Sequence, residues 1–173
     1  GKESLEDVAK VVSEYCDIAA LRIFSHEDLV KFAKNSKIPI INALDNFEHP
    51  CQILGDLMTI LEVKGKLKNL KLAYLGDSNN NVTHSLIYGC TKLGIDISIG
   101  CPGKKEFMPL PVVVKEGKKL AKQNKCSFEI LDNALDAVKN ADIVYTDSWM
   151  SYRISKKEKP RRVKILKKFH VNK

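Results

Sequence analysis

The sequence predicts an α/β protein in which two parallel-sheet units are joined by a helix. Three observations lead to this prediction. Segments with helical spacing of apolar residues alternate with short apolar runs, which is typical of parallel strands covered by helices. A break rich in Lys and Gly at residues 64–68 separates two such series. Polar side chains follow the apolar runs, at the strand ends where open parallel sheets bind ligands.

The first series covers residues 1–63. Ser25, followed by Glu27 and Asp28, predicts a capped helix start with acids in its first turn. The same run holds the residue types of a hydrolytic site, but neighbouring residues at a helix start point in different directions. Pro50 suits the first position of the joining helix, because its missing N–H costs nothing there. The expected elements are helices over 4–15, from Ser25 and over 50–63, a buried strand over 18–23 and a short strand over 38–41.

The second series covers residues 64–173. Its apolar runs are rich in Leu, Ile and Val and alternate with segments of helical spacing, so a second parallel sheet covered by helices is expected. The expected elements are strands over 72–75, 95–99, 127–131 and 142–146, and helices over 82–93, 112–123 and 134–138.

The positive charge is confined to one end of the chain. The formal net charge is +8, but residues 153–173 hold ten Lys and Arg against one acid, and the rest of the chain is nearly neutral. A terminal run of this kind is usually a solvated surface. We therefore expect a solvated tail and no nucleic-acid partner.

Composition excludes several classes of protein. The 173 residues are 44% hydrophobic and 29% charged, and no apolar run approaches the ~18–20 residues of a membrane span. A disordered tail, a collagen-like fibre and a membrane protein are excluded. The first ten residues are polar and show no signal peptide, so the cytoplasm is the expected compartment. Five widely spaced cysteines without a Cys-x-x-Cys pair indicate reduced thiols rather than a zinc site or a disulfide framework.

The first motif, His49-Pro50-Cys51-Gln52, lies at the start of the joining helix. Free N–H groups and the dipole at a helix start favour anions and developing negative charge. There His49 can donate a hydrogen bond to an oxygen, and Gln52 can hold an amide-like group. The alternative is that His49 is a helix cap and Gln52 a solvated helix residue.

The second motif, Gly76-Asp77-Ser78-Asn79-Asn80-Asn81, joins a strand to a helix. It has the position of a dinucleotide-binding loop but lacks the G-x-G-x-x-G pattern. Its asparagine amides can bind a carboxylate or a phosphate. The alternative is a polar turn with an asparagine helix cap.

The third motif, Tyr145-Thr146-Asp147-Ser148-Trp149-Met150-Ser151, follows another expected strand. Asp147 and Ser151 stand four residues apart in one loop, where an acid and a hydroxyl can together bind an ammonium group. The alternative is a helix cap beside a buried Trp149.

In their order and spacing the three motifs resemble the ornithine carbamoyltransferase family, and the segment Arg22–Leu29 is similar to the family's strand–helix step. The resemblance runs from Gly1 to about Lys168. His-Pro-x-Gln is shared with the aspartate enzymes, whereas the asparagine loop and the Asp-x-Trp-x-Ser loop select ornithine. The resemblance implies two Rossmann-like units and transfer of the carbamoyl group of carbamoyl phosphate to the side-chain amine of L-ornithine.

The resemblance also implies roles for the first motif. Arg22 resembles the arginine that binds carbamoyl phosphate, a use suited to the guanidinium fork. His49 is similar to the donor to the carbonyl oxygen, and Gln52 to the residue that holds the carbamoyl amide. These three residues are the expected catalytic group.

The amino-acid substrate has its own set of residues. Asn81 resembles the asparagine that binds the α-carboxylate, while Asp147 and Ser151 resemble the pair that binds the α-amino group. The family usually continues with Met-Gly after this serine, whereas Tyr152 and Arg153 stand here. The change places a bulkier side chain beside the amino-acid site. Tyr152 is therefore a further candidate, and another amine such as putrescine is an alternative acceptor.

The family pattern implies no metal and no organic cofactor. Its Ser-Thr-Arg-Thr and His-Cys-Leu-Pro elements do not occur in this sequence. The chain therefore resembles a middle portion, with residues 1–63 as the second half of a carbamoyl-phosphate domain and 64–173 as the first half of an ornithine domain. We expect this portion alone to be inactive, and a non-catalytic anion-binding fragment is the alternative. The family further implies arginine metabolism and a homotrimer, or a multiple of trimers, with residues 1–4 near a neighbouring subunit's site.

Overall fold

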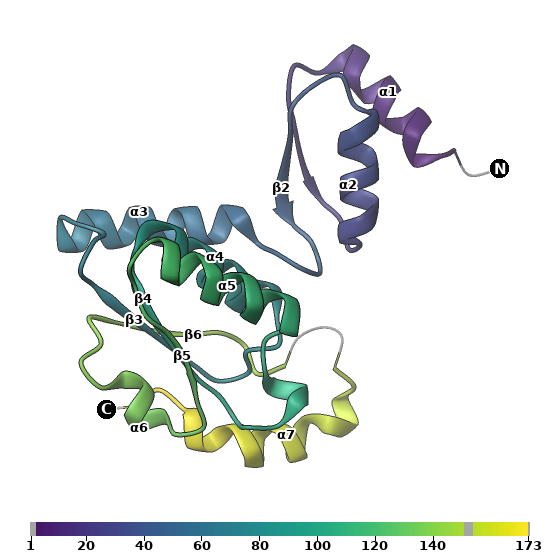
Figure 1. Ribbon diagram of the computed structural model, residues 1–173. Helices are drawn as coiled ribbons and strands as arrows, with labels where there is room; N and C mark the ends of the chain where they lie inside the picture. The colour runs from purple at the N-terminus through teal and green to yellow at the C-terminus, as the bar shows by residue number, and fades with distance from the viewer. Residues whose placement is uncertain (1–2, 151–153, 173) are drawn as a thin grey trace.

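The computed structural model describes residues 3–150 and 154–172. They form an α/β fold in which two parallel sheets are joined by a long helix, α3 (Pro50–Lys64), as Figure 1 shows. The expected fold class is confirmed. The smaller unit contains strands β1 (Ala19–Arg22) and β2 (Ile40–Leu44) and helices α1 (Leu5–Tyr15) and α2 (His26–Asn35).

The larger unit is built on a four-stranded sheet. Its elements are β3 (Lys71–Leu75), α4 (Asn81–Leu93), β4 (Asp96–Gly100), η1 (Lys105–Phe107), α5 (Pro111–Gln123), β5 (Phe128–Leu131), α6 (Ala134–Val138), β6 (Ile143–Thr146), η2 (Lys156–Glu158), α7 (Lys159–Leu166) and η3 (Lys167–Phe169). The strand order is β5-β4-β3-β6, with every pair parallel. Figure 1 shows α4 and α5 on one face of the sheet, on the side of α3, and α6 and α7 on the other. Within the described ranges, no helix is long and apolar enough to cross a membrane.

The central strands β3 and β4 form the core because helices cover both of their faces. Leu72, Tyr74, Ile97 and Ile99 are all fully buried there. Strand β3 ends level with both of its neighbours, because Leu75 pairs with Gly100 of β4 and with Thr146 of β6. The loops that leave β3 and β6 therefore start side by side, which brings the second and third motifs to one edge of the sheet.

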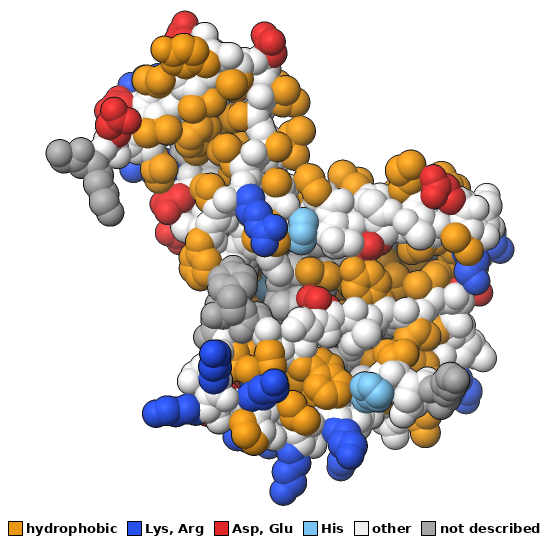
Figure 2. Space-filling model, turned by 180° about the vertical axis from the view of Figure 1, so that it is seen from behind, with side chains coloured by type: hydrophobic (Ala, Val, Ile, Leu, Met, Phe, Trp, Pro, Cys, Tyr) orange, Lys and Arg blue, Asp and Glu red, His pale blue; other side chains and the backbone are white. Residues whose placement is uncertain are grey.

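The smaller sheet differs from the expectation of a buried first strand. Burial alternates along β1, and the side chains of Ile18 and Ile41 are 55% and 42% exposed. Figure 1 shows α1 and α2 on one side of the two strands, and Figure 2 shows hydrophobic side chains gathered on the surface of this unit. The second strand also runs to Leu44 rather than ending at 41, because its pairing with β1 continues across a register shift after Leu21.

Most charges of the basic segment lie on a solvated surface, as expected, but the segment itself is folded against the larger unit. Residues Lys156–Phe169 form η2, α7 and η3 and lie over one face of the larger sheet (Figure 1). Arg162, Leu166 and Phe169 are buried, at the helical spacing of one face, while the lysines of the segment are exposed. The charge lies outward and a narrow buried stripe attaches the segment to the sheet.

Helices α3 and α4 approach closely at a glycine. A Cβ atom on Gly89 would lie 2.4 Å from Cγ1 of Ile53, a distance that real contacts do not allow. Ile53 is buried in the main apolar cluster, so it has little room to move. The absence of a side chain at Gly89 therefore sets the distance between the joining helix and the larger unit.

Gly89→Ala is expected to lower the free energy of unfolding by about 1–3 kcal/mol, because the added methyl overpacks this contact. Gly55→Ala, within α3, is the matched control. No atom lies within 4 Å of the Cβ position there, so alanine should raise stability by up to ~1 kcal/mol through helix propensity. Urea unfolding measures both changes, and equal stability of the two variants would contradict the close approach.

Candidate active site

The turn that leads into α3 is organised by a fully buried carboxylate, that of Asp45. Its Oδ1 accepts hydrogen bonds from the main-chain N–H groups of Phe47 and Glu48, each at 2.7 Å. Its Oδ2 lies 2.6 Å from Nδ1 of His26 and 2.8 Å from Nδ2 of Asn42. Four partners satisfy the carboxylate and determine the course of residues 45–48, which is why α3 begins where it does.

His49 stands directly before α3, and its side chain makes no helix-cap hydrogen bond. Its main-chain N–H donates to Oγ of Ser85 at 2.8 Å, and Pro50 takes the first helical position. The Nδ1 atom of the imidazole is buried without a hydrogen-bond partner among the described residues. His49 therefore occupies the cap position of α3, but its side chain does not cap the helix.

The pKa of His49 is lowered, first by burial and then by the positive charge of Arg22. Asp56 and Asp147 act in the opposite direction. Arg22, at the end of β1, and Asp147, directly after β6, both act electrostatically on this imidazole. At neutral pH the ring is neutral and can donate one hydrogen bond from one nitrogen.

Gln52 lies one turn further along α3 and is exposed. Its Nε2 donates to Oδ1 of Asp56 at 2.9 Å. This intrahelical bond holds the amide on the side of the helix that carries Asp56, a residue close enough to influence the pKa of His49. The carbonyl oxygen of the Gln52 amide carries no bond in this arrangement among the described contacts.

The start of α4 confirms the asparagine helix cap, whereas binding of a carboxylate or phosphate by the loop stays a prediction. Asn80 is the cap, since its Oδ1 accepts from the N–H of Thr83 at 2.8 Å. Asn81 instead donates from Nδ2 to the main-chain oxygen of Asp45 at 2.6 Å. The amide of Asn81 thus joins the larger unit to the turn before α3, and its second N–H is not used in that bond.

The third motif continues from the end of β6. The hydroxyl of Thr146 donates to the main-chain oxygen of Leu75 at 2.8 Å, which fixes the two strand ends to each other. Asp147 is exposed, and Trp149 is partly buried. No helix starts within residues 147–150, so the helix-cap interpretation fails in this described part of the loop. Ser151 and Tyr152 lie outside the described residues.

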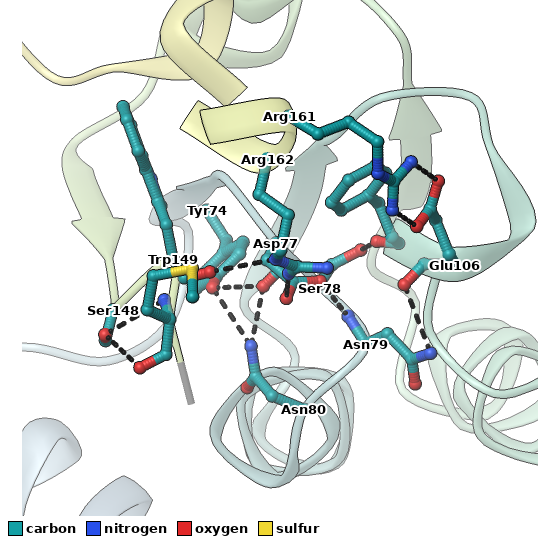
Figure 3. Close-up of polar contacts among 12 residues, drawn as sticks. Tyr74, Asp77, Ser78, Asn79, Asn80, Glu106, Ser148, Trp149, Arg161 and Arg162 are labelled. Atoms are coloured by element: carbon teal, nitrogen blue, oxygen red, sulfur yellow. Dashed lines mark hydrogen bonds and ion pairs between the residues drawn. The ribbon is translucent and has the colours of Figure 1, made fainter. Parts of the chain in front are cut away.

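A buried ion pair that the sequence analysis missed connects the second and third motifs. Figure 3 shows the guanidinium of Arg162, from α7, against the carboxylate of Asp77, from the loop after β3. Nε of Arg162 also donates to the main-chain oxygen of Trp149 at 3.2 Å. The available signal was the helical spacing of Arg162 with Leu166, which marks an arginine on an apolar face.

Two family models match the chain almost end to end. The model described as the carbamoyl-P binding domain of aspartate/ornithine carbamoyltransferase matches residues 1–62, and that of the Asp/Orn binding domain matches residues 68–173. The chain belongs to the aspartate/ornithine carbamoyltransferase family. The resemblance of the three motifs is thereby confirmed.

Relatives in the carbamoyltransferase family match over the whole chain. An ornithine carbamoyltransferase of Picrophilus torridus is 41% identical over 98% of this chain and 55% of its own length. An anabolic ornithine carbamoyltransferase of Pyrococcus furiosus is 42% identical over 99% of this chain and 53% of its own length. The solved structure of an ornithine carbamoyltransferase from Pyrococcus furiosus superposes with a TM-score of 0.92 at 41% identity, covering 100% of this chain and 54% of that one. The chain spans about half the length of the relatives it matches.

The neutral state of His49 predicts a titration with a definite sign. Its imidazole should titrate below 6.5, the ordinary value, because burial and Arg22 disfavour the charged form. Since the unfolded chain then binds the proton first, the stability that this group contributes falls as the pH drops through 6.5.

Arg22→Gln should raise the pKa of His49, and Asp147→Asn should lower it further. NMR titration of the labelled histidines, with His49→Gln for assignment, measures these shifts. Shifts of the same sign in the two variants would contradict the arrangement.

Proposed function

We propose that this protein transfers the carbamoyl group of carbamoyl phosphate to the side-chain amine of L-ornithine, forming citrulline and phosphate. The observation that carries the proposal is the His49 imidazole at the start of α3. Its Nδ1 is buried without a hydrogen-bond partner in the described part of the chain, and its pKa is lowered by burial and by the charge of Arg22. The two matched domain models and the relatives named ornithine carbamoyltransferase support it.

The proposed step uses the residues around the start of α3. Arg22 and the helix N-terminus would hold the phosphate and the carbonyl oxygen, since both attract anions. Gln52 would hold the carbamoyl amide. The neutral amine attacks the carbamoyl carbon, a C–N bond forms, and the C–O bond to phosphate breaks. The proton that the amine loses goes to the departing phosphate. His49 would donate to the carbonyl oxygen as that oxygen gains charge.

The amino-acid end of the substrate would lie against the larger unit. Asp147, with Ser151, would bind the α-amino group, and the second N–H of Asn81 would bind the α-carboxylate. This assignment favours ornithine over putrescine, because putrescine has neither an α-carboxylate nor an α-amino acid centre. It also divides the chain into a carbamoyl-phosphate unit, 1–63, and an ornithine unit, 64–173, a division that the ranges of the two domain models support.

The proposed cellular setting is arginine metabolism in the cytoplasm, with a homotrimer as the assembly. The name of the anabolic Pyrococcus furiosus relative supports the biosynthetic direction. Because the 173 residues correspond to about half the length of the relatives, we expect them to be inactive when isolated. The active protein should therefore have a mass well above 19.5 kDa.

Two measurements on the protein that the natural gene encodes test the proposal. They are citrulline formation from carbamoyl phosphate and ornithine, and the intact mass of the protein. We expect turnover of ornithine in preference to putrescine and aspartate. His49→Ala and Gln52→Ala should each lower kcat by about 100–1000-fold, the range typical of one lost donor to a developing oxyanion. Gln123→Ala, an exposed glutamine at the end of α5, is the matched control and should leave kcat unchanged. Preference for putrescine would show that Asn81 and Asp147 are wrongly assigned.

A further inference from the structure

One arginine of the basic segment contacts three separate parts of the larger unit. The Arg162 side chain pairs with the carboxylate of Asp77, and its Nε donates to the main-chain oxygen of Trp149 at 3.2 Å. Its guanidinium carbon lies 4.7 Å from the ring centre of Phe107. Arg162 and Asp77 are only 6% and 7% exposed. Solvent therefore screens this pair far less than the surface pairs of the same segment.

The Asp77 side of this contact leads to the start of α4. The main-chain oxygen of Asp77 accepts from Nδ2 of Asn80 and from the hydroxyl of Tyr74, both at 2.6 Å (Figure 3). Asn80 in turn caps α4, whose first residue is Asn81. Arg162 is thus connected to the start of α4, and so to Asn81, through Asp77 and the cap residue Asn80.

The Trp149 side leads to Asp147, two residues earlier in the loop. The Trp149 indole also packs against Gly76, where a Cβ atom would lie 3.3 Å from its Nε1. Gly76 has a φ of +130°, which favours glycine over other residues. The backbone after β3 and the backbone after β6 therefore meet at Trp149. Arg162 bonds to the Asp77 side chain of the first loop and to the main-chain oxygen of Trp149 in the second.

We propose that Arg162 is a positioning residue for the amino-acid substrate, because it sets the spacing between Asn81 and Asp147. The inference rests on the proposed function, in which these two residues bind the two ends of the α-amino acid group. A planar guanidinium suits the task, since it can bond in two directions at once within a buried site. Arg162 would contact no substrate atom itself.

The expected kinetic effect is confined to one substrate. Arg22 and His49 belong to β1 and to the start of α3, and neither contacts Arg162. Loss of Arg162 should raise the KM for ornithine by about 10–100-fold, as misplacement of binding groups by an ångström does, and leave the KM for carbamoyl phosphate within about twofold. A general loss of folding would instead lower the amount of active protein without this split.

The test needs a variant that folds. Arg162→Met alone leaves the Asp77 carboxylate buried without a counter-charge, which is strongly destabilising. The double variant Asp77→Asn with Arg162→Met removes both charges and still removes the donor to Trp149. Arg161→Met is the matched control. The neighbouring Arg161 is exposed and forms a two-bond pair with Glu106, at 2.8 and 2.5 Å, so this variant should keep both KM values.

A second readout does not depend on turnover. Trp149 is the single tryptophan of these 173 residues. With any tryptophan outside them replaced by Phe, the fluorescence reports on this loop alone. Quenching of the Trp149 fluorescence by acrylamide should increase about twofold or more in the double variant, because the loop loses its hydrogen bond to the buried Arg162 side chain. It should stay unchanged in Arg161→Met. Both readouts are made on the natural full-length protein.

The possible results separate the two proposals. An ornithine-specific rise in KM with increased Trp149 quenching supports the positioning role. Unchanged quenching and an unchanged KM for ornithine in the double variant would overturn it, and so would equal rises for both substrates. Absence of ornithine turnover in the unaltered protein would overturn the proposed function, whereas increased quenching in the double variant would still support the role of Arg162 in holding the loop.

Discussion

A single buried carboxylate, that of Asp45, holds together the turn on which the candidate site depends. Burial of an unpaired charge is costly, and here the cost is offset by His26, Asn42 and two main-chain N–H groups of the turn itself. The main-chain oxygen of the same residue accepts from Asn81 of the larger unit. The turn before α3 therefore has one course, which ends at His49 and places the imidazole at the junction of the two units.

A second buried carboxylate, that of Asp77, lies on the other side of the start of α4. Its partner Arg162 comes from a segment about 85 residues further along the chain, at the opposite face of the sheet. The start of α4 is thus held from two directions, by Asn81 toward the smaller unit and by Asn80 toward the ion pair. This arrangement holds the first residue of α4, Asn81, in one position relative to the turn before α3.

The sequence predicted the elements well because apolar spacing and strand-end polarity are local signals. Residues 82–93 and 112–123, for example, differ from the observed helices by one residue at the start. Exposure of Ile18 and Ile41 was not predictable, because an apolar strand looks the same whether its second face is covered or open. Burial of Arg162 was also missed, since its partner is distant in sequence and charge counting treats every arginine of a basic run alike. For the candidate site, the motifs indicated His49 and Asp147, and the family resemblance indicated Arg22. The electrostatic influence of Arg22 and Asp147 on one imidazole depends on tertiary structure.

The central claim is that the ends of the two sheets form one site, with the carbamoyl group at His49 and the amino-acid group at Asp147. A crystal structure of the natural full-length protein with L-citrulline and phosphate bound tests it most directly. The account predicts the carbamoyl oxygen within hydrogen-bond distance of His49, phosphate at the start of α3 near Arg22, and the α-amino group against Asp147. Citrulline bound in the reverse orientation, or away from the start of α3, would contradict the account.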